Sequence, residues 1–241
     1  MLAATLISVA FGADQPPSPG VIVEWLRDDG SDEPATPTPD IDLQPTSTPA
    51  PVEESGFSYP ISGACLPSSN LLMPGAPREY RQGVHEGIDF YDVDSCTFVG
   101  RDTEVLGTKA GTVIRADYEY EELTAEVAAE ITAAIEEAGG ASDTTLDLLR
   151  GRQVWIDHGD GMVTRYAHLG GIASDIDVGS QIEQGQLIAY VGESGSIDAI
   201  DAPGSQIHLH FEIRGGEGYL GEGLEAAAVR QLYQQAFSPS R

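Results

Sequence analysis

Apolar and polar residues alternate most regularly over residues 207–214. The apolar positions are Ile207, Leu209, Phe211 and Ile213, and the polar positions between them are His208, His210 and Glu212. Because successive side chains of a β-strand point to opposite faces, this pattern predicts a strand with one face in a core and two imidazoles on the other. Two histidines at i and i+2 can reach one small volume, but so short a motif is also typical of a half-exposed strand with solvated rings.

Shorter β patterns precede this strand and extend the prediction to a sheet. Residues 59–66 are consistent with a first strand, and residues 111–115 with a strand that follows a glycine turn. Residues 153–158 and 162–169 alternate on either side of a Gly-Asp-Gly hairpin turn, and residues 178–191 hold two short strands. We therefore expect a mainly β fold built on an antiparallel β-sheet.

One segment, residues 117–152, interrupts the β pattern with helical periodicity. Apolar residues recur at every fourth position from Leu123 to Ile135, which places them on one face of a helix. A Gly-Gly pair follows as a C-cap, and Ser142 or Asp143 can cap a second, shorter helix. The prediction is a helical hairpin inserted between two strands. We interpret it as a decorated loop, and the alternative is a lid or docking element.

The N-terminal region lacks the pattern of a packed domain. Residues 2–13 form an apolar run too short to span a bilayer; it has the length of a signal-peptide core but lacks a positively charged start. Residues 14–57 are rich in Pro, Ser, Thr, Asp and Glu, which favours a disordered or extended linker. We expect an exported protein with a tail and linker over 1–57. One globular domain follows over 58–241 and ends in a peripheral helix at 224–237.

Composition excludes several classes of partner and site. The formal net charge is −27, from 39 acidic and 12 basic residues. Such a surface repels phosphate, so nucleic acid and anionic membrane surfaces are not expected as partners. The only cysteines are Cys65 and Cys96; a bridge between them would close a loop of about thirty residues and stabilise the fold by about 3–4 kcal/mol. Without a Cys-x-x-Cys pair, a cysteine metal site is not expected.

Histidine is scarce, and its positions define the candidate chemistry. Five histidines are present: His85, His158, His168, His208 and His210. His85 and Asp89 form a His-x-Gly-x-Asp motif. Zinc favours histidine nitrogen and carboxylate oxygen, and catalytic sites typically use three protein ligands and one water. His85, Asp89 and one of the paired histidines would satisfy this need. The residues alone leave open whether His208 or His210 is the third ligand.

Three motifs, in order, resemble the lysostaphin/LytM-type zinc endopeptidases of bacterial cell walls. They are His85-Glu-Gly-Ile-Asp89, Tyr166-Ala-His-Leu169 and His208-Leu-His-Phe-Glu212. Strands and turns of that family are also similar to Gly111-Thr-Val-Ile, Val154-Trp-Ile-Asp-His-Gly-Asp-Gly and Val191-Gly-Glu-Ser-Gly. The resemblance covers about residues 83–214, less the helical insertion. It implies a LytM-like domain with a zinc site in a groove.

The resemblance also implies a role for each motif residue. His85, Asp89 and His210 would bind Zn²⁺. His168 and His208 would be the catalytic histidines, which help to deprotonate a metal-activated water and steady the tetrahedral intermediate. The implied function is a zinc metallo-endopeptidase that hydrolyses peptide bonds in the cross-links or stem peptides of peptidoglycan, outside the cytoplasm.

Three segments depart from the usual pattern of that family. They are about twelve extra residues at 91–102, a long loop at 192–204, and the helical hairpin. Such loops wall the substrate groove in this fold, so they leave open which bond is cut. Two alternatives also remain open. One is a non-catalytic LytM-like module that binds the cell wall or regulates another hydrolase, and the other is an enzyme kept latent by its acidic tail or insertion.

Three further residues near the motifs have less specific interpretations. We interpret His158 as structural, because it matches a turn position. Tyr166 could contact substrate from the face of His168, or it could pack in the core. Glu212 could support an imidazole from behind or simply be solvated.

Overall fold

The computed structural model of the protein describes residues 56–216 and 218–238. The predicted signal-like run and nearly all of the predicted linker lie outside these residues. Within them, no helix is both long enough and apolar enough to cross a bilayer.

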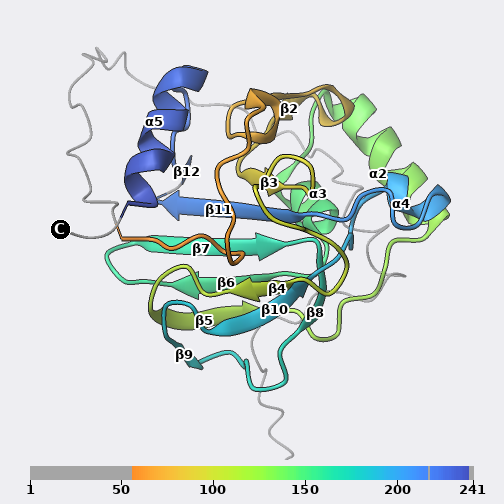
Figure 1. The fold of residues 1–241 in the computed structure, drawn as a ribbon. Coiled ribbons are helices and arrows are strands. Elements are labelled where there is room, and N and C mark those ends of the chain that lie inside the picture. Colours follow the sequence, from red (N-terminus) through yellow and green to blue (C-terminus); the bar gives the residue numbers. More distant parts are fainter. Residues whose placement is uncertain (1–55, 217, 239–241) are drawn as a thin grey trace, which may run out of the picture. The chain divides into compact units, whose positions relative to one another are not determined.

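A seven-stranded antiparallel sheet is the main layer of the described residues (Figure 1). Its strands run in the order β12-β11-β7-β6-β5-β9, and β3 also pairs with β11. Their bounds are β3 Ile88–Phe90, β5 Gly111–Ala116, β6 Val154–Asp157, β7 Met162–Ala167, β9 Gln181–Ile182, β11 Leu209–Gly215 and β12 Gly218–Tyr219. Strand β11 therefore pairs with β7 along one edge and with β3 and β12 along the other.

A second antiparallel sheet shares the core with the first. Its strands run in the order β4-β10-β8. The bounds of these and the remaining short elements are β4 Glu104–Leu106, β8 Leu169–Ile172, β10 Leu187–Val191, β1 Pro77–Arg78, β2 Gly83–Val84, and the 3₁₀ helices η1 Asn70–Leu72 and η2 Glu79–Arg81. One core cluster joins the two sheets, with Ile156 from β6 and Ile188 from β10 among its members. The predicted mainly β, antiparallel fold is confirmed.

Strand β11 has the two faces that its alternation predicts. Leu209, Phe211 and Ile213 are at most 1% exposed and belong to the main core. Burial of such side chains contributes about 1.5–3 kcal/mol each. On the opposite face, the register with β3 sets His210 across from Asp89. Directly opposed residues of antiparallel strands lie on the same face, so this register brings the two side chains together.

The helical insertion contains the two predicted helices. Helix α2 spans Ala125–Ala138 and ends at Gly139, whose φ of 72° is the left-handed conformation that glycine adopts without a steric penalty. Helix α3 spans Asp143–Arg150 and begins at Ser142, whose hydroxyl accepts a hydrogen bond from the third residue of the helix. The local cap signals therefore place both helices correctly.

Apolar contacts hold the insertion against the long loop that precedes β11. Ile131 and Ile135 of α2 and Leu149 of α3 form a second, smaller cluster, and Ile197 packs against it. Ile197 directly precedes the short helix α4, Asp198–Asp201. The insertion and the 192–204 loop are thus in direct contact, and Figure 1 shows α2 and α4 beside each other.

The C-terminal helix is confirmed, but its predicted peripheral place is wrong. Helix α5 spans Ala226–Ala236, and its residues Val229, Tyr233 and Ala236 are fully buried in the main core. These three positions lie three or four residues apart, which puts them on one face of the helix. The helix therefore closes the core rather than decorating it.

The predicted first strand at residues 59–66 does not form. Pro60 has no N–H to donate to a ladder, and Gly63 adopts a φ of 76° that turns the chain. The segment instead makes single contacts, such as the 2.8 Å bond from the Leu106 N–H to the Pro60 carbonyl. Cys65 and Cys96 form a disulfide, which ties this segment to the 91–102 loop.

We expect the double variant Cys65→Ser/Cys96→Ser to lose about 3–4 kcal/mol of unfolding free energy, because a cross-link across this sequence separation limits the unfolded chain. The measurement is urea denaturation of the oxidised wild type, the reduced wild type and the variant. The reduced wild type should match the variant. Equal midpoints for all three samples would show that the bridge adds no stability.

Candidate metal centre

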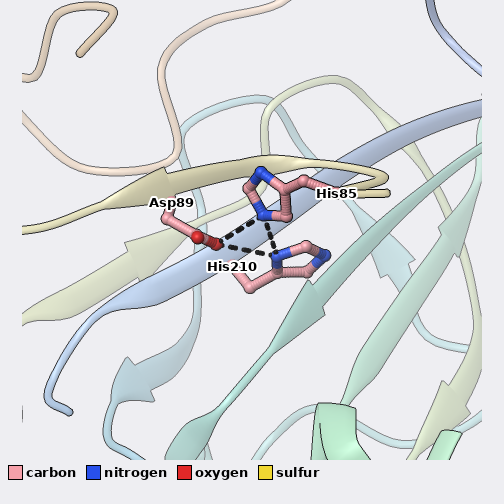
Figure 2. Close-up of side chains that lie close together, drawn as sticks. All are labelled: His85, Asp89 and His210. Carbon is pink, nitrogen blue, oxygen red and sulfur yellow. Dashed lines mark hydrogen bonds and ion pairs between the residues drawn. The ribbon is translucent and has the colours of Figure 1, made fainter. Parts of the chain in front are cut away.

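Three side chains from two distant parts of the chain converge on one point (Figure 2). His85 lies between β2 and β3, Asp89 lies in the middle of β3, and His210 is the second residue of β11. His85 Nε2 is 2.9 Å from Asp89 Oδ1 and 3.1 Å from His210 Nδ1. His210 Nδ1 is 2.8 Å from Asp89 Oδ1. All three residues are buried, and their ligand atoms form a candidate metal cluster.

In each of the two histidines, the ring nitrogen that faces away from the cluster determines whether the nitrogen facing into it can accept a proton or a metal ion. His85 Nδ1 donates to the Met73 carbonyl at 3.1 Å, and His210 Nε2 donates to Glu212 Oε1 at 3.0 Å. In the neutral rings, His85 Nε2 and His210 Nδ1 are therefore lone-pair acceptors. Together with the Asp89 carboxylate they form three acceptors that face one another. Such a set needs a proton or a cation between its members.

The spacing of the three acceptors suits zinc. Zinc bonds of about 2.0–2.1 Å in a tetrahedron place ligand atoms about 3.3 Å apart, and here they are 2.8–3.1 Å apart. A shift of a few tenths of an ångström is enough. Two imidazoles and one carboxylate are also a typical donor set for a catalytic zinc site.

Gly87 is required by the close approach of β11. A Cβ at this position would lie 2.5 Å from the Phe211 carbonyl oxygen and 2.9 Å from His210 Nε2. Contacts this short would push His210 away from His85 and Asp89. The glycine between the first two metal-ligand candidates is therefore part of the centre's geometry rather than a flexible spacer.

Burial and neighbouring charges shift the pKa values of the three residues. Burial lowers the pKa of His85 to about 4, so its ring is neutral at neutral pH. Burial would raise the pKa of Asp89, but His85 and His210 outweigh it and hold the pKa well below its usual value. Burial would lower the pKa of His210, but hydrogen bonds with Asp89 and Glu212 outweigh it and raise the pKa.

His168 and His208, the predicted catalytic pair, lie beside this cluster. Their ring centroids are 4.5 Å apart, and the His168 ring is 5.8 Å from that of His210. His168 Nδ1 donates to the Ser194 carbonyl at 2.8 Å, and His208 Nδ1 donates to the carbonyl of Gln206 at 2.7 Å. Both neutral rings thus keep Nε2 as a proton acceptor. The structure brings all five predicted site residues together.

His168 occupies a backbone conformation that is uncommon for a residue with a side chain. It follows β7 with a φ of 56°. Left-handed backbone at a non-glycine residue costs of order 1 kcal/mol and tends to persist where a site requires it. The His168 N–H is held by the Arg150 carbonyl at 2.8 Å. Two contacts, one through the backbone and one through the ring, therefore fix the direction of this imidazole.

Tyr91 is a site residue that the sequence did not reveal. Its ring stacks on that of His208, with centroids 4.4 Å apart and an angle of 8° between the planes. Its hydroxyl donates to the Gln206 side chain at 3.3 Å. Tyr91 begins the extra 91–102 segment, where no periodic pattern or motif marks it. The pairing of β3 with β11, which sets Phe90 opposite Leu209, brings Tyr91 to His208.

The structure also shows the contacts and burial of the three residues whose sequence predictions were less specific. His158 bonds with the Ala110 carbonyl and with Thr164, which is a structural arrangement. Tyr166 is fully buried and its hydroxyl accepts from the Thr108 N–H, so it packs in the core. Glu212 is fully buried behind His210 rather than solvated.

The five residues open into a cavity of about 470 Å³. The helical insertion contributes to its wall through Thr132 and Ile135 of α2 and through Leu149 and Arg150 of α3. The insertion, interpreted from the sequence as a decorated loop, therefore forms part of the wall of this cavity.

Comparison with known proteins places these observations in context. The sequence profile of peptidase family M23 matches residues 83–221, more than half of the 241-residue chain. No curated protein matches the chain. The matched range includes all five predicted site residues and the helical insertion.

Several solved structures are similar. A zinc-containing peptidase from Vibrio cholerae is 21% identical with a TM-score of 0.41, and the match covers 68% of this chain but 38% of that one. The catalytic domain of the prophage-encoded M23 protein EnpA from Enterococcus faecalis is 18% identical with a TM-score of 0.41, over 68% and 92% of the two chains. The lysostaphin catalytic domain from Staphylococcus simulans is 18% identical with a TM-score of 0.35, over 74% and 89%.

We expect zinc to bind more tightly as the pH rises, because the raised pKa of His210 means that zinc must displace a proton there. In the metal-free protein, the stability from protonated His210 is complete below the ordinary value of 6.5 and is lost as the pH rises through the raised pKa. The zinc-induced rise in Tm should therefore be larger at about pH 8 than at about pH 6. Asp89→Asn should abolish the rise at both, and a rise independent of pH would contradict the assignment.

Proposed function

Because the chain belongs to peptidase family M23, we propose that it is a zinc-dependent endopeptidase that hydrolyses peptide bonds in the cross-links or stem peptides of peptidoglycan. The observation that carries the proposal is the convergence of His85, Asp89 and His210, with two further histidines directly beside them. A site that only stabilised the fold would not need two additional imidazoles that line the same cavity.

In this proposal, His85 Nε2, Asp89 Oδ1 and His210 Nδ1 hold Zn²⁺. When bound, the ion would lower the pKa of a water ligand and polarise the substrate carbonyl. His168 and His208 handle protons and stabilise developing negative charge. Burial lowers the pKa of both rings, so each is neutral and able to accept a proton at neutral pH.

The cavity supplies the surface for a peptide substrate. Leu71 and Tyr80 line it and remain 65% and 61% exposed. Exposed apolar side chains at the rim of a polar centre are typical of a surface that binds a ligand. Ile197 and Ile135 face the same cavity from the 192–204 loop and from α2.

We also propose that the enzyme acts outside the cytoplasm. The disulfide between Cys65 and Cys96 supports this location, because cytoplasmic thiols are kept reduced. Its peptidoglycan substrate would lie on the same side of the membrane.

The test is digestion of purified peptidoglycan by the zinc-loaded full chain, with the released fragments identified by mass. His208→Ala and His168→Ala should each lower the rate at least about 100-fold while zinc remains bound, because general acid–base catalysis contributes about that much. His158→Asn, which changes a histidine bonded to Ala110 and Thr164, is the matched control.

Two results would refute the proposal. One is purified protein that binds no zinc, and the other is hydrolysis that survives both substitutions. Tight binding to peptidoglycan without hydrolysis, despite bound zinc, would instead support a non-catalytic wall-binding module.

We expect Tyr91→Phe to retain nearly full activity and Tyr91→Ala to lose about threefold to tenfold in kcat, because stacked rings contribute about 0.5–1.5 kcal/mol. The phenylalanine keeps the stack on His208 and loses only the bond to Gln206. Steady-state hydrolysis of a defined muropeptide measures the effect. Equal rates for Tyr91→Ala and wild type would show that the stack does not orient His208.

A further inference from the structure

The carboxylate behind His210 is held by more than the histidine. Glu212 is fully buried, and its Oε1 accepts from His210 Nε2 at 3.0 Å. The same oxygen accepts from Arg150 Nε at 2.7 Å, while Oε2 accepts from Arg214 at 2.9 Å. A buried carboxylate is tolerated only when it is paired and hydrogen-bonded. Arg150 shares with His210 the one oxygen that fixes the imidazole.

Arg150 is not part of the sheet that carries the histidines. It is the last residue of α3, at the end of the helical insertion, and its side chain is 8% exposed. Arg150 Nη2 donates to Glu86 Oε2 at 2.5 Å. Glu86 directly follows His85 in the chain. One guanidinium thus bridges a carboxylate beside His85 and a carboxylate behind His210.

The main chain of the same residue reaches the predicted catalytic side of the site. The Arg150 carbonyl accepts from the His168 N–H at 2.8 Å. Arg150 therefore touches the surroundings of His85, His210 and His168. A solvent-exposed loop would not show contacts to three separate functional segments.

Helix α3 is itself anchored, so that Arg150 is presented in a defined place. Asp147 accepts two hydrogen bonds from Arg115 of β5, at 2.6 and 3.0 Å. Asp147 also accepts from the Gln153 amide at 3.0 Å. Paired, two-point contacts between guanidinium and carboxylate restrict orientation as well as distance. Strand β5 therefore fixes the position of α3, and α3 in turn fixes the position of Arg150 at its end.

We propose that Arg150 is a positioning residue of the metal centre and that the helical insertion exists in part to supply it. The proposal rests on the proposed zinc function and deepens it. Without Arg150, Glu212 would keep Arg214 on Oε2 but lose the second donor on Oε1. The carboxylate can then turn toward Arg214, and the His210 ring loses its fixed acceptor. Partners behind a metal-binding histidine typically affect metal affinity by about 10–100-fold.

The experiment compares zinc affinity, by competition with a chromophoric chelator, in the full-length wild type, Arg150→Gln and Arg150→Lys. We expect affinity to fall about 10–100-fold in Arg150→Gln. Lysine keeps the charge but cannot bridge Glu86 and Glu212, so Arg150→Lys should lie between the two. Arg101→Gln is the matched control, because it removes the same charge from a half-exposed arginine bonded to Glu193.

A second readout separates positioning from folding. The visible spectrum of the Co²⁺-substituted protein reports the geometry around the metal, and it should change in both Arg150 variants but not in Arg101→Gln. If Arg150→Gln fails to fold, Arg150→Lys decides the question by the same two measurements.

The outcomes for this proposal and for the proposed function are distinct. Wild-type affinity and an unchanged spectrum in a folded Arg150 variant overturn the positioning role, while zinc binding by the wild type leaves the proposed function standing. A wild type that binds no zinc overturns both.

Discussion

The antiparallel pairing of β11 with β3 is the constraint on which the candidate centre depends. It sets His210 opposite Asp89, so that two of the three convergent side chains meet across one ladder. A slip of one residue would turn His210 into the core and Leu209 toward the cavity. That slip is excluded because Phe211 and Ile213 would lose their burial as well. The hydrophobic core thus fixes the direction of the imidazoles.

Charge compensation is the second constraint. The chain as a whole carries −27 with 12 basic residues, yet four arginines pair with Asp89 or Glu212, and the most distant is Arg165 at 3.7 Å from Glu212 Oε2. Arg78 donates to Asp89 Oδ2 at 2.9 Å, and Arg150 and Arg214 donate to Glu212. Removing one partner from such buried pairs is costly, since the remaining charge stays out of water. The chain as a whole therefore has a large excess of negative charge, whereas the buried carboxylates of the centre are paired with arginines.

Local patterns explain what the sequence could predict. The alternation of apolar and polar residues predicts most of the strands. Apolar residues at every fourth position, together with the caps at Ser142 and Gly139, predict the two helices of the insertion. Residues 59–66 were predicted wrongly, because Pro60 and Gly63 outweigh their apolar content. The third ligand could not be chosen from the residues, since His208 and His210 lie on one face. In the structure His210 Nδ1 lies 2.8 Å from Asp89 Oδ1, whereas His208 Nε2 lies 3.7 Å from the same oxygen.

Long-range contacts explain what the sequence could not predict. Tyr91, directly after β3, meets His208, directly before β11, and Arg150 meets Glu212 across 62 positions of the chain. No periodicity relates such pairs. The sequence favours a decorated loop for the helical insertion because its own caps and apolar stripe account for both of its helices. Its link to the centre lies in one terminal arginine, whose partners are known only once the chain has folded.

The disulfide has a topological consequence for assembly of the centre. Cys65 and Cys96 close a covalent ring that contains both His85 and Asp89, while His210 lies outside it. His85 and Asp89 are already near one another in the chain, and the ring limits the conformations of the segment that carries both of them in the unfolded state. The ring thus carries two of the three ligand candidates, and β11 supplies the third, His210. The three side chains can meet only when β11, in the C-terminal part of the sheet, pairs with β3 inside the ring.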